Sequence, residues 1–170
     1  MAITLDQIRA EKKILWDNKA RQEKWDRRYL DIAKSVSQWS KDPSTKVGAV
    51  LVRDNRIVSV GYNGFPEGVD DSEERYNNRE LKYDLVVHAE VNAIISAGER
   101  ARESTLYIYP GFGSPCMCTG CAKAAIQAGV KRVAGLIEEI DPERLERWKA
   151  SLTNAQLLCD EAGIETVVYE

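Results

Sequence analysis

Two apolar runs around a short polar turn decide the fold of this chain, and over residues 47–60 they read VGAVLVRDNRIVSV. The first run is Val47–Val52 and the second is Ile57–Val60, and both are rich in the β-branched residues that favour strands. Asp54-Asn55 lies between the runs, and both residue types are common in tight turns. The stretch therefore predicts a β-hairpin.

Helical and strand patterns alternate along the rest of the chain after a polar segment. The predicted elements are a helix over 88–98, a strand over 105–109, a helix over 118–128, a strand over 132–137, a helix over 142–162 and a strand over 164–168. Pro142 suits a helix start, whereas Gly129 and Gly163 suit helix ends. A hairpin followed by this alternation predicts one layered α/β domain, with a mixed sheet and helices on both of its faces.

The residues before the hairpin predict two helices. Thr4 is suited to cap a first helix, whose apolar residues are sparse. A second, amphipathic helix is predicted over residues 23–40, and Asp42-Pro43 is expected to end it. After the hairpin, the polar segment from Gly61 to about Tyr83 is long for a connection, which favours a binding or regulatory role.

The overall composition is that of a globular protein. Of the 170 residues, 44% are hydrophobic and 30% are charged, which suits one domain with a substantial core. The net charge of −3 argues against general nucleic-acid binding, where a basic surface supplies most of the affinity. No apolar run approaches the roughly 20 residues that span a bilayer, and the first residues lack a signal-peptide core. We therefore expect no membrane partner, no nucleic-acid partner and a cytoplasmic location.

The cysteines and the only histidine predict a metal site. Three of the four cysteines fall within Cys116–Cys121, and without a secretory signal such clustering favours metal binding over disulfides. The histidine, His88, opens the triplet His88-Ala89-Glu90. Together with Cys118 and Cys121 it supplies three ligands for one tetrahedral metal ion. Three protein ligands and an open fourth position are typical of a zinc ion that activates water.

Both halves of this motif fall at predicted helix starts. Helix N-termini carry partial positive charge and free N–H groups, which favour a thiolate and keep an imidazole neutral. Cys118 and Cys121 are almost one helical turn apart, so their sulfur atoms project to nearly the same side. Cys116 and Cys118 have a less suitable spacing, and Cys116 is therefore predicted to be a spare thiol that lines the site.

The combination matches H-x-E…P-C-x-x-C, the signature of zinc-dependent nucleobase deaminases, except that Met117 takes the proline position. Glu90 lies two residues after His88, so we expect it beside the metal without being a ligand. In this chemistry zinc lowers the pKa of its bound water, and Glu90 carries a proton from that water to the ring nitrogen of the base. A proton then passes from Glu90 to the departing ammonia.

Each of these motifs, taken alone, has another interpretation. A lone histidine at a helix start usually caps or packs, and a lone Cys-x-x-Cys is redox-active or half of a closed zinc finger in many proteins. Their occurrence together, with a glutamate two residues past the histidine, favours the deaminase site. Two further functions stay open: deamination of a base within RNA or DNA, and a non-catalytic zinc-containing nucleotide-binding module. The second of these needs a fourth protein ligand such as Cys116.

Several further stretches carry a family resemblance. They are Ser40–Ser44, Val47–Ala49, Gly61–Pro66, Lys82-Tyr83, His88–Ile94, Cys118–Lys123, Ile126–Gly129 and Glu161–Gly163. On these stretches the chain, from about Trp25 to Tyr169, resembles the deoxycytidylate (dCMP) deaminases of the cytidine-deaminase superfamily. The zinc motif identifies the superfamily, and Gly61–Pro66 points to the dCMP branch.

The resemblance implies a three-layer αβα sandwich with a central mixed five-stranded sheet. Residues 1–22, which precede the stretch that carries the resemblance, are expected to form an N-terminal helical extension, followed by a zinc-dependent deaminase domain, residues 23–170. The activity implied is hydrolytic deamination of a cytosine deoxynucleotide, dCMP to dUMP and ammonia. The implied zinc ligands and proton carrier are those of the motif: His88, Cys118 and Cys121 for Zn²⁺, and Glu90 for the proton.

Substrate and effector contacts are also implied by the resemblance. Asn63 would contact the nucleoside, the backbone N–H of Ala89 would face the base carbonyl, and Ser40 and Lys41 would contact the phosphate. Members of this family are often homo-oligomers, commonly hexamers, that dCTP activates and dTTP inhibits. Asn63 and Gly64 would belong to the effector site, with Mg²⁺ accompanying the nucleotide effector.

Three features depart from the family pattern. The first is around the cysteines, where Gly111–Pro115 is an insertion and Met117 takes the motif proline position. The second is that residues 1–22 extend beyond the usual start. Leu136–Asp141 lacks the tyrosine that the family often places there to contact the substrate. Besides Ser40 and Lys41, the cations considered for the phosphate are Arg27, Arg28, Lys46 and Arg79, although most such charges are simply solvated.

Overall fold

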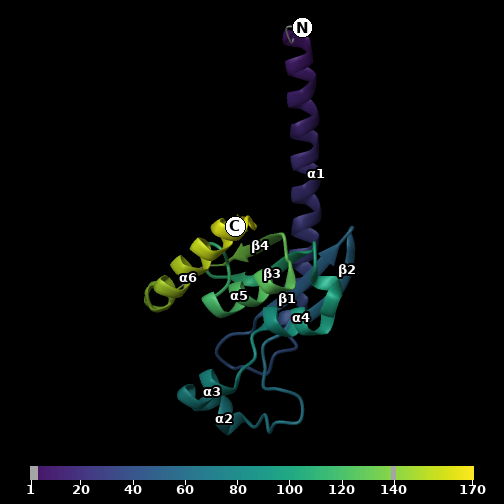
Figure 1. Cartoon of the computed structure of the whole chain (residues 1–170). Coiled ribbons are helices and arrows are strands. Elements are labelled where there is room, and N and C mark those ends of the chain that lie inside the picture. Colours follow the sequence, from purple (N-terminus) through teal and green to yellow (C-terminus); the bar gives the residue numbers. More distant parts are fainter. Residues whose placement is uncertain (1–3, 139–140) are drawn as a thin grey trace.

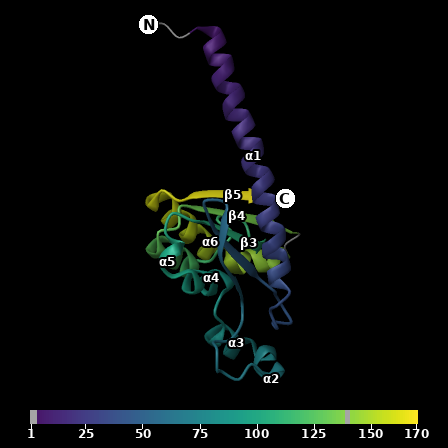
Figure 2. The same ribbon diagram turned by 90° about the vertical axis from the view of Figure 1, so that its right-hand side faces the viewer.

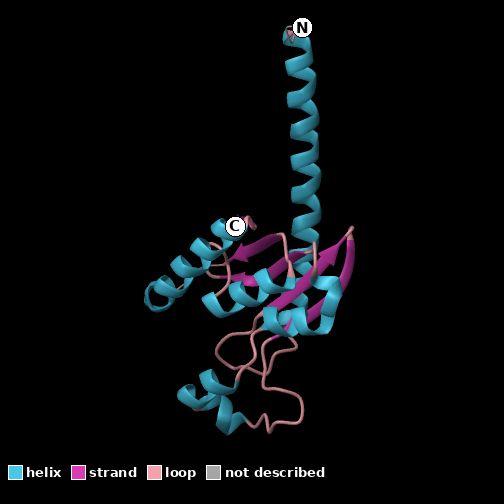
Figure 3. Cartoon of the chain, in the orientation of Figure 1, coloured by secondary structure: helices cyan, strands magenta, loops and turns pink. Residues whose placement is uncertain are grey.

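A five-stranded sheet lies at the centre of the part of the chain that the computed structural model describes, residues 4–138 and 141–170. Its strands are β1 (Gly48–Arg53), β2 (Arg56–Tyr62), β3 (Thr105–Gly111), β4 (Arg132–Ile137) and β5 (Glu165–Tyr169). The order across the sheet is β2-β1-β3-β4-β5. Strand β1 is antiparallel to both of its neighbours, whereas β3, β4 and β5 are parallel. The sheet lies among helices (Figure 3). The prediction of a mixed sheet is confirmed.

Helices cover both faces of this sheet. They are α1 (Leu5–Ser37), α2 (Glu73–Asn77), α3 (Arg79–Leu85), α4 (Ala89–Ala97), α5 (Thr119–Ala128) and α6 (Pro142–Ala162), with a 3₁₀ turn over Gly98–Ala101. Helix α1 packs on one face, and α4 and α5 pack on the other, where α6 lies against α5 (Figures 1 and 2). The predicted three-layer αβα sandwich is confirmed.

The two sides of the sheet have different cores. Large side chains fill the side of α1, among them Tyr29, Leu30 and Tyr107. The opposite side is rich in alanines, and Ala89 and Ala122 are fully buried there. Because alanine side chains are small, the starts of α4 and α5 lie close to the sheet and to each other.

The sequence signals for turns and helix ends are confirmed. Asp54 and Asn55 have φ angles of 53° and 57°, the conformation of a two-residue hairpin turn whose twist matches the strands. Helix α5 ends at Gly129 and α6 at Gly163, both left-handed, and Pro142 opens α6. These local signals thus fix the boundaries of the elements that surround the sheet.

The two helices predicted before the hairpin are one continuous helix, α1. Thr4 caps it, because its hydroxyl oxygen accepts from the Gln7 N–H at 3.3 Å while the Gln7 side chain accepts from the Thr4 N–H at 2.8 Å. No proline or glycine interrupts residues 5–37. The N-terminal half projects away from the domain, and Trp16 is 73% exposed (Figure 1). Residues 1–3 of the predicted extension lie outside the described residues.

Helix α1 also ends earlier than predicted. It ends at Ser37, and the chain leaves through successive tight turns at 38–40. The carboxylate of Asp42 instead accepts the backbone N–H groups of Ser44 and Thr45 at 2.8 and 3.2 Å. Asp42 therefore shapes the following loop and does not set the end of the helix.

A buried carboxylate fastens α1 to the sheet. The Asp26 side chain is fully buried and accepts hydrogen bonds from Arg132 at 2.6 and 3.0 Å, from the Tyr107 hydroxyl at 2.7 Å and from the Tyr169 hydroxyl at 2.6 Å. Burial alone would raise the pKa of Asp26, but these hydrogen bonds, foremost that from Arg132, hold it below its usual value. Asp26 therefore stays ionised and joins α1 to β3, β4 and β5.

The polar segment after the hairpin contains two helices that were not predicted, α2 and α3. They have five and seven residues, too few for an apolar period to stand out. The segment is held by the Tyr76 ring, which stacks on Phe65 with ring centroids 4.4 Å apart, and by Lys82, whose ammonium lies 3.1 Å from the Asp42 carboxylate. Among residues 4–138 and 141–170, no helix is both long and apolar enough to cross a membrane.

Candidate zinc-dependent active site

The first half of the site lies at the start of α4. His88 is the residue before the helix, and Ala89 and Glu90 follow in the first turn, 0% and 5% exposed. Gly61 of β2 lies against this turn, where a Cβ atom would overlap the Ala89 carbonyl oxygen and the Ala93 nitrogen. The absence of a side chain at Gly61 thus allows the close approach that fixes His88 and Glu90.

The second half of the site lies at the start of α5. Cys118 takes the capping position, and its sulfur accepts the Cys121 backbone N–H at 3.5 Å. Thr119 is tied to α6, because its N–H donates to the Ser151 hydroxyl at 3.0 Å and its own hydroxyl donates to the Ser151 carbonyl at 2.8 Å. Helix α6 thereby holds the two cysteines in place.

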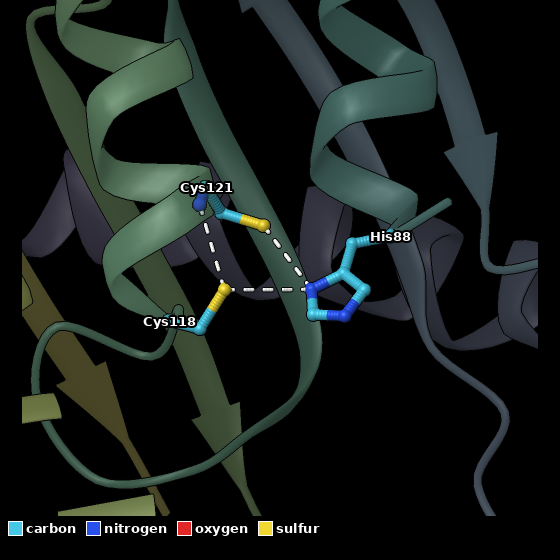
Figure 4. A group of neighbouring side chains, drawn as sticks. All are labelled: His88, Cys118 and Cys121. Carbon is cyan, nitrogen blue, oxygen red and sulfur yellow. Dashed lines mark hydrogen bonds between the residues drawn. The ribbon is translucent and has the colours of Figure 1, made fainter. Parts of the chain in front are cut away.

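The two halves meet at one point (Figure 4). Nδ1 of His88 lies 3.5 Å from Sγ of Cys118 and 3.3 Å from Sγ of Cys121, and the three ligand atoms all lie within 4.8 Å of one another. A tetrahedral zinc ion, with bonds of about 2.3 Å to sulfur and about 2.0 Å to nitrogen, keeps such ligands about 3.5 Å apart. The donor atoms and their spacing fit zinc.

Cys116 is not a member of this group. It has a φ angle of 67°, is 2% exposed, and packs its thiol over Gly111 and Gly135. Burial raises the pKa of Cys116 to about 12. Among the described residues, no fourth histidine, cysteine or carboxylate joins the group, as a closed structural zinc site would require.

The surroundings of Cys118 favour a negative sulfur. A hydrogen bond from Cys121, supported by His88, lowers the pKa of Cys118 to about 4, although burial opposes this. The same contact with Cys118 raises the pKa of His88 to about 9. The contact therefore favours the thiolate form of Cys118, which is the form that binds a metal. A zinc ion has to displace the ligand protons, so its binding releases protons and weakens in acid.

Glu90 lies beside this group in surroundings that favour its neutral form. Burial raises the pKa of Glu90, while the positive charge of His88 opposes the rise. A carboxyl group with a raised pKa suits a residue that has to accept and then donate a proton near neutral pH.

A cavity of about 470 Å³ opens onto the site. His88, Glu90 and Cys118 line it, and so do Asn63 and Ala89, whereas Cys121 lies behind them in the core. The other polar or aromatic residues that line it include Asp42, Tyr76, Arg79, Lys82, Phe112, Asp141, Arg144, Arg147 and Trp148. Three further residues expected at the substrate or effector, Ser40, Lys41 and Gly64, do not line it.

Asn63 and its neighbours form a hydrogen-bonded loop at the cavity wall. Oδ1 of Asn63 accepts the Val47 N–H at 2.8 Å, and Nδ2 donates to the Thr45 carbonyl at 2.9 Å. The buried hydroxyl of Ser40 donates to the Asn63 carbonyl at 2.8 Å, whereas Lys41 forms an exposed ion pair with Asp71. Ser40 thus supports Asn63 from behind, and Lys41 lies on the surface.

Sequence reasoning missed the wall that α6 contributes. The Trp148 ring lies in an edge-to-face arrangement with the His88 ring, with centroids 6.4 Å apart, and the Arg144 guanidinium lies 4.2 Å from the centre of the Phe112 ring. Phe112 belongs to the insertion recognised before the cysteines. The available signal was the helical spacing of Arg144, Arg147 and Trp148, which places them on one face of α6.

An αβα sandwich with one histidine and two cysteines at the starts of adjacent helices, beside a buried glutamate, defines a zinc-dependent nucleobase deaminase. Comparison with known proteins agrees. The family model described as the cytidine and deoxycytidylate deaminase zinc-binding region matches residues 23–136. A deaminase in the luxG 3′ region of Aliivibrio fischeri is 40% identical over 144 residues, covering 84% of this chain and 91% of that one.

Two further comparisons bear on the branch of the family. A probable deoxycytidylate deaminase of Caenorhabditis elegans is 44% identical over 134 residues, covering 76% of this chain and 66% of that protein. The crystal structure of dCMP deaminase from the cyanophage S-TIM5, in complex with dCMP and dUMP, is 27% identical with a TM-score of 0.62, covering 85% of this chain and 95% of that chain. The chain belongs to the deoxycytidylate deaminase family of the cytidine-deaminase superfamily.

Proposed function

We propose that this enzyme hydrolyses dCMP to dUMP and ammonia. The observation that carries the proposal is the three-ligand group of His88, Cys118 and Cys121 beside a cavity that also exposes Glu90. The deoxycytidylate deaminases to which the chain is similar, one of them solved with dCMP and dUMP, support the choice of substrate.

The metal role belongs to His88, Cys118 and Cys121, which hold Zn²⁺ through one nitrogen and two sulfur atoms. When bound, zinc supplies a Lewis acid that makes a water molecule acidic near neutral pH. The start of α5 keeps Cys118 ionised for this purpose, and the tie between Thr119 and Ser151 keeps both sulfur atoms oriented.

The proton role belongs to Glu90. It accepts a proton from the attacking water and delivers it to the cytosine ring nitrogen next to the reacting carbon. It then takes the proton of the hydroxyl group now on that carbon and passes it to the amine, which leaves as ammonia as the carbonyl forms. Its buried position supports both steps, because a raised pKa makes the carboxyl group a better base and leaves its neutral form within reach.

Base and sugar recognition belong to Ala89 and Asn63. The first N–H groups of a helix have no partner within it, so the Ala89 N–H in the first turn of α4 is suited to donate to the base carbonyl. Asn63 contacts the nucleoside through Oδ1, which accepts one hydrogen bond within the chain and has a second lone pair.

Regulation and assembly follow the family resemblance. In this proposal dCTP, with Mg²⁺, activates and dTTP inhibits at a site that includes Asn63 and Gly64, in a cytoplasmic homo-oligomer, by resemblance a hexamer. The bridge between Gly64 and Val87, directly before His88, supports a route from effector to zinc site. Residues 1–22 form a helical extension and residues 23–170 the deaminase domain.

Ammonia release tests the proposed function. Zinc-loaded protein is assayed with dCMP, dCTP, CMP and deoxycytidine, each with and without added dCTP or dTTP as effector. Release from dCMP at the highest kcat/KM is expected. Failure to release ammonia from any cytosine nucleotide would refute the function, whereas insensitivity to both effectors would refute only the regulation.

A further inference from the structure

We propose that Arg144 and Arg147 of α6 bind the 5′-phosphate of the substrate and so make the enzyme prefer nucleotides to nucleosides. The inference rests on the proposed function, since it adds a subsite to the same cavity. Both arginines line that cavity, although they lie more than fifty residues after His88 in the sequence.

One face of α6 presents groups suited to both ends of a nucleotide, the base and the phosphate. Arg144, Arg147 and Trp148 are spaced as i, i+3 and i+4, so they share one face of the helix. Trp148 marks the base end, because its ring lies against that of His88, with centroids 6.4 Å apart. Arg144 lies one turn away, about 6 Å along the helix axis. A base held at His88 and Glu90 therefore directs its phosphate towards the arginines.

The charges around the cavity leave these arginines available for an anion. Three carboxylates line the cavity, and Asp42 is occupied by Lys82 while Glu90 serves the reaction. Asp141 caps α6, because its side chain accepts the Glu143 N–H at 3.1 Å. Within residues 4–138 and 141–170, neither Arg144 nor Arg147 forms an ion pair with a carboxylate.

Arg144 is held ready for a charged partner. Its guanidinium is half-buried over the Phe112 ring. Burial lowers the pKa of Arg144, and the neighbouring charge of Arg147 adds to this. A phosphate dianion between the two guanidinium groups would relieve both their repulsion and their desolvation. Arginine presents forked donors that fit phosphate oxygens, which a neutral nucleoside cannot use.

On the opposite wall, Arg79 is a third cation available to the phosphate, whereas Lys82 is not available to it. Arg79 of α3 also lines the cavity, and its guanidinium lies 5.5 Å from the centre of the Tyr83 ring. Lys82 is bound instead to the Asp42 carboxylate and the Ser44 hydroxyl, both at 3.1 Å. Lys82 is therefore a structural cation, and the phosphate lies between α6 and Arg79.

Binding of the product and of its nucleoside tests this subsite independently of turnover. Isothermal titration of zinc-loaded protein measures the dissociation constants of dUMP and deoxyuridine. Wild-type protein is compared with Arg144→Ala, Arg147→Ala, the double variant and Lys41→Ala. Each arginine substitution is expected to weaken dUMP binding about tenfold and the double variant about a hundredfold, as for charge-assisted hydrogen bonds. Deoxyuridine binding should change less than about twofold, since it makes no such bond.

A control variant and a second readout make the outcome decisive. Lys149→Ala removes a cation from the same helix that pairs with Glu146 outside the cavity, and it should leave both dissociation constants unchanged. Arg147 is exposed, so its variant keeps the fold even if Arg144→Ala does not. In kinetics, the double variant should raise KM for dCMP while kcat/KM for deoxycytidine stays constant.

Three results would overturn the subsite. In the first, the arginine substitutions weaken dUMP and deoxyuridine binding equally. In the second, the double variant binds dUMP as tightly as wild type. In the third, Lys41→Ala loses the preference for dUMP over deoxyuridine and the arginine variants keep it. Wild-type protein that binds dUMP through these arginines yet releases no ammonia from dCMP would sink the proposed function and leave the subsite standing.

Discussion

Two walls of the cavity are built in opposite ways. The zinc wall consists of His88, Glu90, Cys118 and Cys121 at the starts of α4 and α5. Cys121 of this wall and the neighbouring Ala89 belong to the main buried cluster, and the two residues are 1% and 0% exposed. The α2–α3 wall, residues 73–85, instead lies outside both hydrophobic clusters and is attached through the Lys82 ion pair and the Tyr76 ring.

The difference separates the reaction from substrate entry. Metal ligands and a proton carrier have to be held within a fraction of an ångström, which tight packing achieves. A nucleotide has to enter and a product has to leave, which is easier beside a segment with few buried contacts. We therefore expect changes in the zinc wall to alter kcat, and changes in the α2–α3 wall to alter KM and local stability.

The largest effect is expected from Glu90→Gln in the zinc wall. The amide keeps the shape of the side chain but cannot carry a proton, so kcat for dCMP should fall about 10²- to 10⁴-fold. Zinc content, measured by atomic emission on the same sample, should stay near one ion per chain, as for wild type. A variant that kept half of its activity would remove Glu90 from the mechanism.

Lys82→Met should be the most damaging change in the α2–α3 wall. It leaves the buried Asp42 carboxylate without its cation, and breaking a buried ion pair costs about 3–5 kcal/mol. We expect faster amide hydrogen exchange in residues 73–85 and a higher KM. Lys41→Met is the matched control for stability, because its ion pair with Asp71 is exposed and contributes less than about 1 kcal/mol. Equal effects of both variants would contradict the assignment.

Gly61→Ala should disturb the zinc wall from behind. The added methyl group overlaps the Ala89 backbone and has to push α4 away, at a cost of about 1–3 kcal/mol of folding stability. Zinc affinity should fall as well, because His88 moves with α4. Gly64→Ala is the control for stability. A Cβ atom there meets only the Tyr76 hydroxyl at 3.6 Å, so its folding stability should stay closer to that of wild type. Urea unfolding and a competition assay with a zinc chelator measure the two quantities.

The smallest effect is expected from Tyr76→Leu. The change keeps an apolar side chain but removes the stacking on Phe65, a contact worth about 0.5–1.5 kcal/mol. Exchange in α2 should accelerate while global unfolding and kcat stay close to wild type. A large fall in kcat would mean that the two walls are coupled more strongly than their packing indicates.

The sequence predicted those elements whose signals are local. The turn at Asp54-Asn55, the left-handed ends at Gly129 and Gly163, and the start at Pro142 each depend on one or two residues with a strong conformational preference. The grouping of His88 with Cys118 and Cys121 was also anticipated, because one helical turn fixes the cysteine spacing.

The rest depended on contacts that no local pattern reveals. Helices α2 and α3 are too short to show a period, and Lys82 is buried only because Asp42, forty residues earlier, lies beside it. Arg144 and Arg147 have the same pattern as solvated residues on a surface helix. Only the packing of α6 against α5 turns that face into the cavity.

The fastening at Asp26 has a consequence for the order in which the protein assembles. The partners of this carboxylate are 81, 106 and 143 residues away along the chain, in β3, β4 and β5. During synthesis α1 is therefore made before the strands, yet its anchor is completed only when β5 leaves the ribosome. Until then Asp26 lacks its hydrogen bond from Tyr169, and the outer edge of β4 lacks its neighbouring strand. The nascent chain should be most dependent on chaperones in that interval, after its zinc ligands have all been made.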